Sequence, residues 1–245
     1  MLPGASEFVV ALALGLVAGT LSGIVGFGTS IMMMPVLMIL FGPQQAVPIM
    51  AVVSILVNLS RIVVWWREIV WRPCLTYAAT AAPAAALGAR TLLELPPHLV
   101  EAALGAFFLA MIPVRRMLAA RNVRIKLWHL AVAGAPIGYL TGIVASTGPI
   151  SAPVFLALGL VKGAFLATEA ASSLAIYVTK AATFQALGAL SWDLALAGLI
   201  IGSSLMAGSV VARRFVLKLD RERFELLMDG LLLVSGAVML WIARA

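Results

Sequence analysis

The feature that most constrains this chain is a series of apolar segments that follow one another along almost its whole length. Only 11% of the 245 residues are charged and 63% are hydrophobic, whereas a soluble domain has about 25% charged residues. A chain with so little polar surface folds in a bilayer rather than in water. We therefore predict an all-α polytopic membrane protein. The apolar segments are 8–24, 27–41, 46–66, 72–92, 99–114, 127–143, 149–160, 163–187, 191–212 and 224–243.

Six of these segments are predicted to cross the bilayer, namely 46–66, 72–92, 99–114, 163–187, 191–212 and 224–243. The other four fall into two pairs, and a polar break that contains glycine splits each pair. The second members of the pairs, 27–41 and 149–160, are shorter than the ~20 residues that a normal span needs. Each pair is therefore predicted to be a broken helix.

The two halves of the chain repeat a set of residues in the same order. The matched positions are Gly23 and Gly142, Pro35 and Pro153, Gly42 and Gly159, Ser54 and Ser173, Arg61 and Lys180, Trp71 and Trp192, and Gly88 and Gly208. This ordered series indicates a duplication. We expect a first transmembrane repeat over 1–122 and a second over 123–245, each a broken-helix hairpin followed by three transmembrane helices.

The positive charges predict how these repeats are oriented. The net charge is +7, and cations gather in the short loops 61–72, 115–126 and 213–223. Cytoplasmic loops of membrane proteins carry such an excess of Lys and Arg, so no nucleic-acid partner is implied. Both 115–126 and 213–223 can be cytoplasmic only if the broken segment between them makes an even number of crossings. Each half then crosses an odd number of times, and the repeats are inverted, as in many secondary transporters.

The two breaks are the first candidates for a binding site. The first contains Gly26, Phe27, Gly28, Thr29 and Ser30, and the second contains Ser146, Thr147 and Gly148. A helix that starts at such a break presents free N–H groups and a partial positive charge, which suits an anion. Glycines can also serve only to let helices pack closely. Because two breaks lie at matched positions, we expect them to line one central cavity.

Ionisable side chains inside the spans are the second group of candidates, since a buried charge in a membrane is costly and is usually functional. Lys180 is predicted to be the main fixed charge that faces the anion, and Arg61 either lines the site or extends to the membrane surface. Glu169 is a coupling residue, a partner of Lys180 or an interfacial residue. Two helical stripes carry these side chains, one with Ser54, Asn58 and Arg61 and the other with Glu169, Ser173, Tyr177 and Lys180.

The sequence Gly23-Ile24-Val25-Gly26-Phe27-Gly28, followed by Pro35, Gly42 and Ala46, resembles the sulfite exporter TauE/SafE family, also called the toluene sulfonate uptake permease family. The counterpart from Gly142 to Gly159 and the segment with Trp192 and Gly208 are similar to it as well. The resemblance implies a multi-pass transporter of a bacterial inner membrane. Its partners would be the lipid bilayer and a small organosulfur anion such as sulfite or a sulfonate, exchanged between the two sides of the membrane. A homodimer is compatible with the sequence.

Two other functional classes remain open at this stage. A non-transporting scaffold or assembly factor is one of them. An intramembrane enzyme that uses Ser146 is the other, although such chemistry needs a base within reach and the two histidines, His98 and His129, lie near segment ends. No cofactor or metal is predicted, because Cys74 is the sole cysteine and no P-loop pattern occurs.

The charge pattern makes a direct prediction about topology. Both chain termini should lie outside the cytoplasm, and 115–126 and 213–223 should lie inside. A cysteine introduced by Leu118→Cys in a Cys74→Ala background should react with a membrane-impermeant maleimide only after the cells are broken open. Labelling of this cysteine in intact cells would contradict the inverted arrangement.

Overall fold

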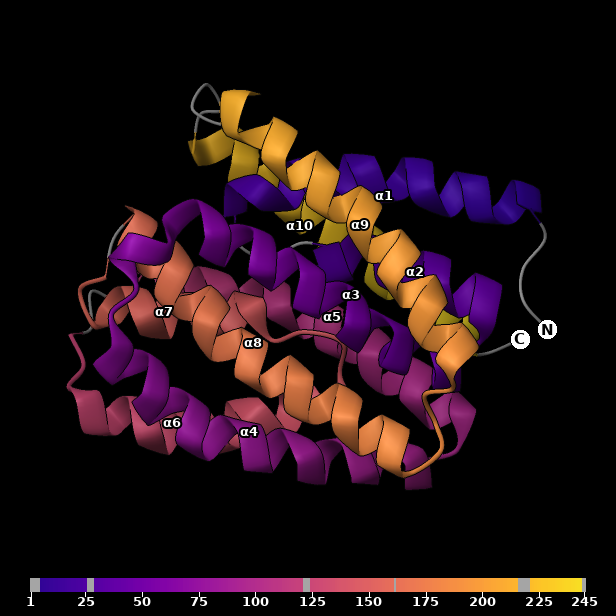
Figure 1. Ribbon diagram of the computed structural model, residues 1–245, viewed down its shortest axis with the longest axis horizontal. Helices are drawn as coiled ribbons and strands as arrows, with labels where there is room; N and C mark the ends of the chain where they lie inside the picture. Colours follow the sequence, from indigo (N-terminus) through magenta and orange to yellow (C-terminus); the bar gives the residue numbers. More distant parts are fainter. Residues whose placement is uncertain (1–4, 26–28, 121–123, 161, 216–220, 244–245) are drawn as a thin grey trace.

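The computed structural model describes residues 5–25, 29–120, 124–160, 162–215 and 221–243. Within these ranges the chain is helical and contains no strand (Figure 1), which confirms the all-α prediction. The helices are α1 (Ala5–Val25), α2 (Thr29–Phe41), α3 (Pro43–Trp65), η1 (Trp66–Glu68), α4 (Trp71–Glu94), α5 (Pro97–Ala120), α6 (Leu127–Ile143), α7 (Gly148–Ala157), α8 (Lys162–Ala186), α9 (Trp192–Phe215) and α10 (Arg221–Ile242).

The second broken segment is a hairpin, as its predicted even number of crossings requires. Helix α6 ends at Ile143, and α7 begins at Gly148, so only four residues lie between the two helices. The amide of Ile125, just before α6, donates to the carbonyl of Ala157 at the end of α7 over 3.1 Å. The chain therefore leaves and returns at the same end of the molecule. The first break has the same order of helices, α1 then α2, although 26–28 lie outside the described residues.

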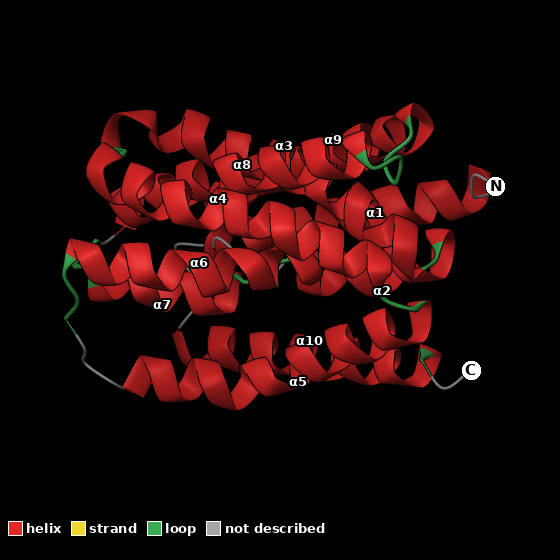
Figure 2. Cartoon of the chain, turned by 90° about the horizontal axis from the view of Figure 1, so that it is seen from below, coloured by secondary structure: helices red, strands yellow, loops and turns green. Residues whose placement is uncertain are grey.

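Contacts between helices repeat when the two halves are exchanged. Helix α4 packs on α6 as α9 packs on α1, α3 packs on α9 as α8 packs on α4, and α2 packs on α3 as α7 packs on α8. Helices α3 and α8 pack on each other, and so do α5 and α10, which form the outermost layer on one side in Figure 2. This pairing is what a twofold relation between the halves produces. The opposite orientation of the halves in the membrane stays a prediction.

Matched glycines make the closest of these contacts. A Cβ added at Gly88 of α4 would lie 2.1 Å from the carbonyl oxygen of Tyr139 in α6, and one at Gly208 of α9 would lie 2.2 Å from that of Leu16 in α1. Glycine at these positions lets two backbones approach directly. Close helix packing is the alternative role considered above for glycine. The structure has this packing at the matched pair Gly88 and Gly208.

A second matched pair of glycines ends the short helices. Gly42 follows α2 with a φ of 78°, and Gly159 follows α7 with a φ of 94°. Residues with side chains rarely adopt this left-handed conformation, so glycine allows the chain to turn sharply into α3 and α8.

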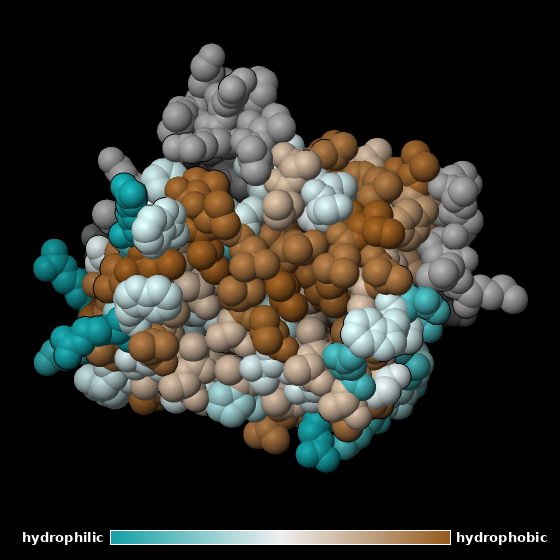
Figure 3. Space-filling model, in the orientation of Figure 1, coloured by the Kyte–Doolittle hydropathy of each residue, from teal (hydrophilic) through white to brown (hydrophobic). Residues whose placement is uncertain are grey.

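The outer surface suits a bilayer. Apolar side chains cover the middle of the face in Figure 3, and hydrophilic residues gather toward its ends. Trp66, Trp71, Trp128, Trp192 and Trp241 are 59–76% exposed and lie near helix ends, where membrane proteins place aromatic anchors. Within the described residues, three helices are long and apolar enough to span a membrane: Pro43–Glu68, Pro97–Val114 and Trp192–Ser209. They correspond to three of the six predicted spans.

Helices α3 and α8 hold most of the buried polar side chains at the centre of the molecule. On α3 these are Ser54, Asn58, Ser60 and Arg61, and on α8 they are Thr168, Glu169, Ser172, Ser173 and Lys180. Because the two helices face each other, their polar groups meet inside the protein rather than in lipid.

The contact between α4 and α6 predicts the effect of enlarging one glycine. A Cβ at Gly138 would lie 2.2 Å from the backbone oxygen of Ala81, so Gly138→Ala should push the helices apart and lower the melting temperature of the detergent-solubilised protein. Gly230→Ala is the control, because no atom lies within 4 Å of a Cβ at that position and alanine favours a helix by about 1 kcal/mol. An unchanged melting temperature for Gly138→Ala would contradict the close contact.

Candidate functional site

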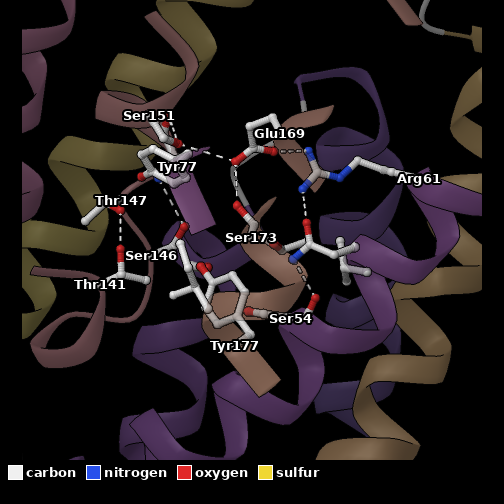
Figure 4. Close-up of a pocket in the computed structure, with 16 residues that line it drawn as sticks. Ser54, Arg61, Tyr77, Thr141, Ser146, Thr147, Ser151, Glu169, Ser173 and Tyr177 are labelled. Carbon is white, nitrogen blue, oxygen red and sulfur yellow. Dashed lines mark hydrogen bonds and ion pairs between the residues drawn. The ribbon is translucent and has the colours of Figure 1, made fainter. Parts of the chain in front are cut away.

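A small cavity lies where both broken segments meet α3 and α8. Its lining is mostly hydroxyl groups, with one guanidinium and one carboxylate, as Figure 4 shows. Six helices and the second break contribute to it: Thr29 and Ser30 from α2; Ser54, Val57, Asn58 and Arg61 from α3; Tyr77 from α4; Thr141 from α6; Ser146 and Thr147 from the second break; Gly148 and Ser151 from α7; and Glu169, Ser173, Ile176 and Tyr177 from α8.

The charged centre of the cavity is an ion pair between the two halves of the chain. Nη1 of Arg61 donates to Oε2 of Glu169 over 2.8 Å, and the two side chains are only 8% and 6% exposed. Nη2 of Arg61 donates to Oδ1 of Asn58. Nε of Arg61 is buried without a hydrogen-bond partner. Since buried polar groups are nearly always paired, this N–H is a donor available to a bound ligand.

The second carboxylate oxygen of Glu169 is bound by hydroxyl groups. Oε1 accepts hydrogen bonds from Ser173 over 2.8 Å and from Ser151 over 3.3 Å. Ser151 belongs to α7, so the carboxylate connects the short helix of the second break to α8, while Arg61 connects it to α3. The position of Glu169 therefore depends on three helices.

The second break presents polar groups to the same cavity. Helix α7 starts at Gly148 and continues with Pro149, which has no N–H to satisfy at this first turn. The hydroxyls of Thr147 and Thr141 hydrogen-bond each other across the break, and Ser146 accepts from the amide of Gly148 over 3.3 Å. The positive end of the α7 dipole thus faces the cavity together with two hydroxyl side chains.

Lys180 does not line this cavity, contrary to the role predicted for it. Its side chain is completely buried, and Nζ donates to the carbonyl oxygens of Thr141 over 2.5 Å and Val144 over 2.8 Å. These carbonyls lie at the end of α6, where the helix dipole is negative and backbone acceptors lack partners. The ammonium is therefore held by the break itself.

Lys180 is also not the partner of Glu169. Eleven residues separate the two along α8, which is about 16 Å of helix. Glu169 is paired with Arg61 instead. Of the two roles left open for Arg61, the structure favours lining the site over reaching the membrane surface, because the guanidinium turns inward to Glu169.

Most of the remaining predicted residues converge on the cavity. Thr29, Ser30, Asn58, Arg61, Ser146, Thr147, Gly148, Glu169 and Ser173 all line it. Gly26, Phe27 and Gly28 lie outside the described residues. The two predicted breaks therefore meet through Thr29 and Ser30 on one side and Ser146 to Gly148 on the other.

Several lining residues were not among the predicted site residues. Ser54 and Tyr177 lie on the polar stripes of α3 and α8, so helical spacing gave a signal for both. Ser151 follows Gly148 by one helical turn. The sequence contains no signal for Tyr77 or Thr141, because only helix packing brings α4 and α6 to the cavity.

The two histidines lie away from Ser146. His98 is exposed at the start of α5. His129 is in the first turn of α6 and stacks on Trp128, with ring centroids 3.6 Å apart. Neither lines the cavity, so the geometry offers Ser146 no imidazole base.

Comparison with known proteins gives one match. The family model described as sulfite exporter TauE/SafE matches residues 11–239, which is nearly the whole chain and includes every described residue of the cavity. No curated protein and no solved structure gave a match. Since the matched range covers both halves and both breaks, the chain belongs to the sulfite exporter TauE/SafE family of membrane transporters.

Proposed function

We propose that the central cavity binds a small organosulfur anion, such as sulfite or a sulfonate, and that the chain carries it across a bacterial inner membrane by alternating access, as an exporter or permease. The observation that carries this proposal is the Arg61 guanidinium, which is buried among hydroxyl groups where the two broken segments meet.

The donors around the cavity fit an anion with several oxygen atoms. A planar guanidinium binds such groups through two parallel N–H bonds, and Arg61 has a buried Nε–H without a partner. Hydroxyls of Thr29, Ser30 and Ser146 can each donate to a further oxygen. The three oxygens of a sulfonate or sulfite would use donors from several directions, whereas chloride would use fewer of them.

The described conformation supports a carrier rather than an open channel. The open space in the cavity is about 20 Å³, which is room for roughly one water molecule. A sulfonate therefore requires the surrounding helices to move apart. The repeated contacts between halves, with α3 on α8 at the centre, support rocking of one half against the other.

Members of this family are transporters and not enzymes, so the intramembrane enzyme is set aside. A scaffold or assembly factor is the remaining alternative. Such a protein would need no buried ion pair with an unused guanidinium N–H, because each buried charge is unfavourable without a compensating role.

Anion exchange in proteoliposomes tests the proposed function. Vesicles with the purified protein and loaded with unlabelled methanesulfonate should take up labelled methanesulfonate by exchange, and external sulfite should compete. Chloride and acetate should compete much less. Correctly folded protein that exchanges none of these organosulfur anions would favour the scaffold.

Arg61 should be required for this exchange. Arg61→Gln alone would leave the Glu169 carboxylate buried and unpaired, at a cost of about 3–5 kcal/mol, so it is combined with Glu169→Gln. The double variant should fold but lose exchange by about tenfold or more, because a hydrogen bond to a charged group contributes about 1.5–3 kcal/mol. Arg67→Gln is the control. Arg67 is exposed in η1, just after the end of α3, and does not line the cavity. Wild-type exchange by the double variant would contradict the role of Arg61.

Lys180 should support the break rather than bind the anion. Lys180→Met removes the donor from two buried carbonyls, so the melting temperature should fall, while methanesulfonate should still raise it. A double Glu169→Ala/Lys180→Ala variant should not recover transport, since the two residues are not partners. The opposite result would contradict this role: if Lys180→Met had a normal melting temperature that methanesulfonate did not raise, Lys180 would be a residue of the anion site.

A further inference from the structure

The charge inside the cavity is balanced before any anion enters. Among the described lining residues, Arg61 supplies one positive charge and Glu169 one negative charge, and they lie 2.8 Å apart. The other groups that can titrate there are the phenols Tyr77 from α4 and Tyr177 from α8, and phenols are uncharged near neutral pH. An entering anion therefore adds an unbalanced negative charge.

The anion would compete with Glu169 for the same guanidinium. Nη1 of Arg61 donates to Glu169 and Nη2 donates to Asn58, whereas Nε has no hydrogen-bond partner. A two-oxygen contact can be made by the free N–H of Nε together with an N–H of a terminal nitrogen, since a guanidinium has five N–H groups. The single guanidinium then faces two anions, and the carboxylate stays buried beside a second negative charge.

A proton on Glu169 removes this conflict. A neutral carboxyl group is far less unfavourable in a dry site than an unpaired carboxylate. Ser151 from α7 and Ser173 from α8 already contact Oε1, and hydroxyls can accept as well as donate. They can therefore hold a protonated Glu169 in place, and its new O–H can also donate to the bound anion.

We propose that Glu169 is a proton-binding site, so that one anion and one proton bind together and are carried together. This inference rests on the proposed function. The anion takes the guanidinium of Arg61, and the carboxylate of Glu169 takes a proton from the water on the side that is open. For a monoanion the loaded cavity has the same charge as the empty one, and the direction of net transport follows the combined gradients of anion and proton.

The pH gradient across proteoliposomes tests this proposal. Methanesulfonate is the probe, because it is the anion of a strong acid and its charge is constant across the pH range used. With the wild-type protein, an acidic exterior should drive accumulation above the external concentration, and an acidic interior should drive loss. Glu169→Gln keeps the size and the polar contacts but cannot take a proton. Accumulation driven by the pH gradient should be lost in Glu169→Gln, and the exchange that remains should no longer depend on pH, while Arg67→Gln should keep the exchange and the accumulation of the wild type.

A second measurement does not depend on a variant. In weakly buffered medium, methanesulfonate entry through the wild-type protein should make the exterior more alkaline, with about one proton for each anion. Net entry of methanesulfonate without this proton movement, or accumulation by Glu169→Gln equal to that of the wild type, would overturn the coupling and leave the proposed function intact. Absence of exchange by the folded wild-type protein would instead overturn the proposed function.

Discussion

The buried ion pair between Arg61 and Glu169 is the interaction around which the rest of this structure is arranged. Neither charge could remain in a membrane interior alone, because the desolvation of either one is compensated only by a close partner. The pair joins α3 of the first half to α8 of the second half, and Ser151 adds the short helix of the second break. The cavity therefore exists because the two halves meet, and its geometry changes if they move relative to each other.

The packing around this centre shows how the halves can meet so closely. Matched glycines at 88 and 208 bring α4 against α6 and α1 against α9 with direct backbone contact. In a bilayer, helices associate through such close contacts rather than through apolar burial, since lipid is as apolar as the side chains. The small residues thus hold α4 against α6 and α1 against α9. Polar side chains of α3 and α8 line the cavity instead.

Arg61 and Lys180 occupy matched positions in the repeat but bind different partners. Lys180 is held by two carbonyls at the end of α6, and Arg61 turns toward Glu169. The difference follows from a single asymmetry, since the position that matches Glu169 in the first half is Met50. A carboxylate on one half only gives the cavity one ion pair and makes the two halves chemically unequal, which fits the proposed binding of an anion together with a proton.

The sequence by itself determined the helical fold, the two broken segments and most of the polar stripe residues, because apolar run length, glycine breaks and helical spacing are local properties. It also carried the family resemblance. Only the tertiary structure decided which cation belongs to the cavity. Arg61 and Lys180 look equivalent along the chain, but a long side chain turns toward whichever acceptor the fold brings near it, and for Lys180 that acceptor is the carboxyl end of α6. Tyr77 and Thr141 joined the site for the same reason, since helix packing rather than sequence spacing places them beside Glu169 and Thr147.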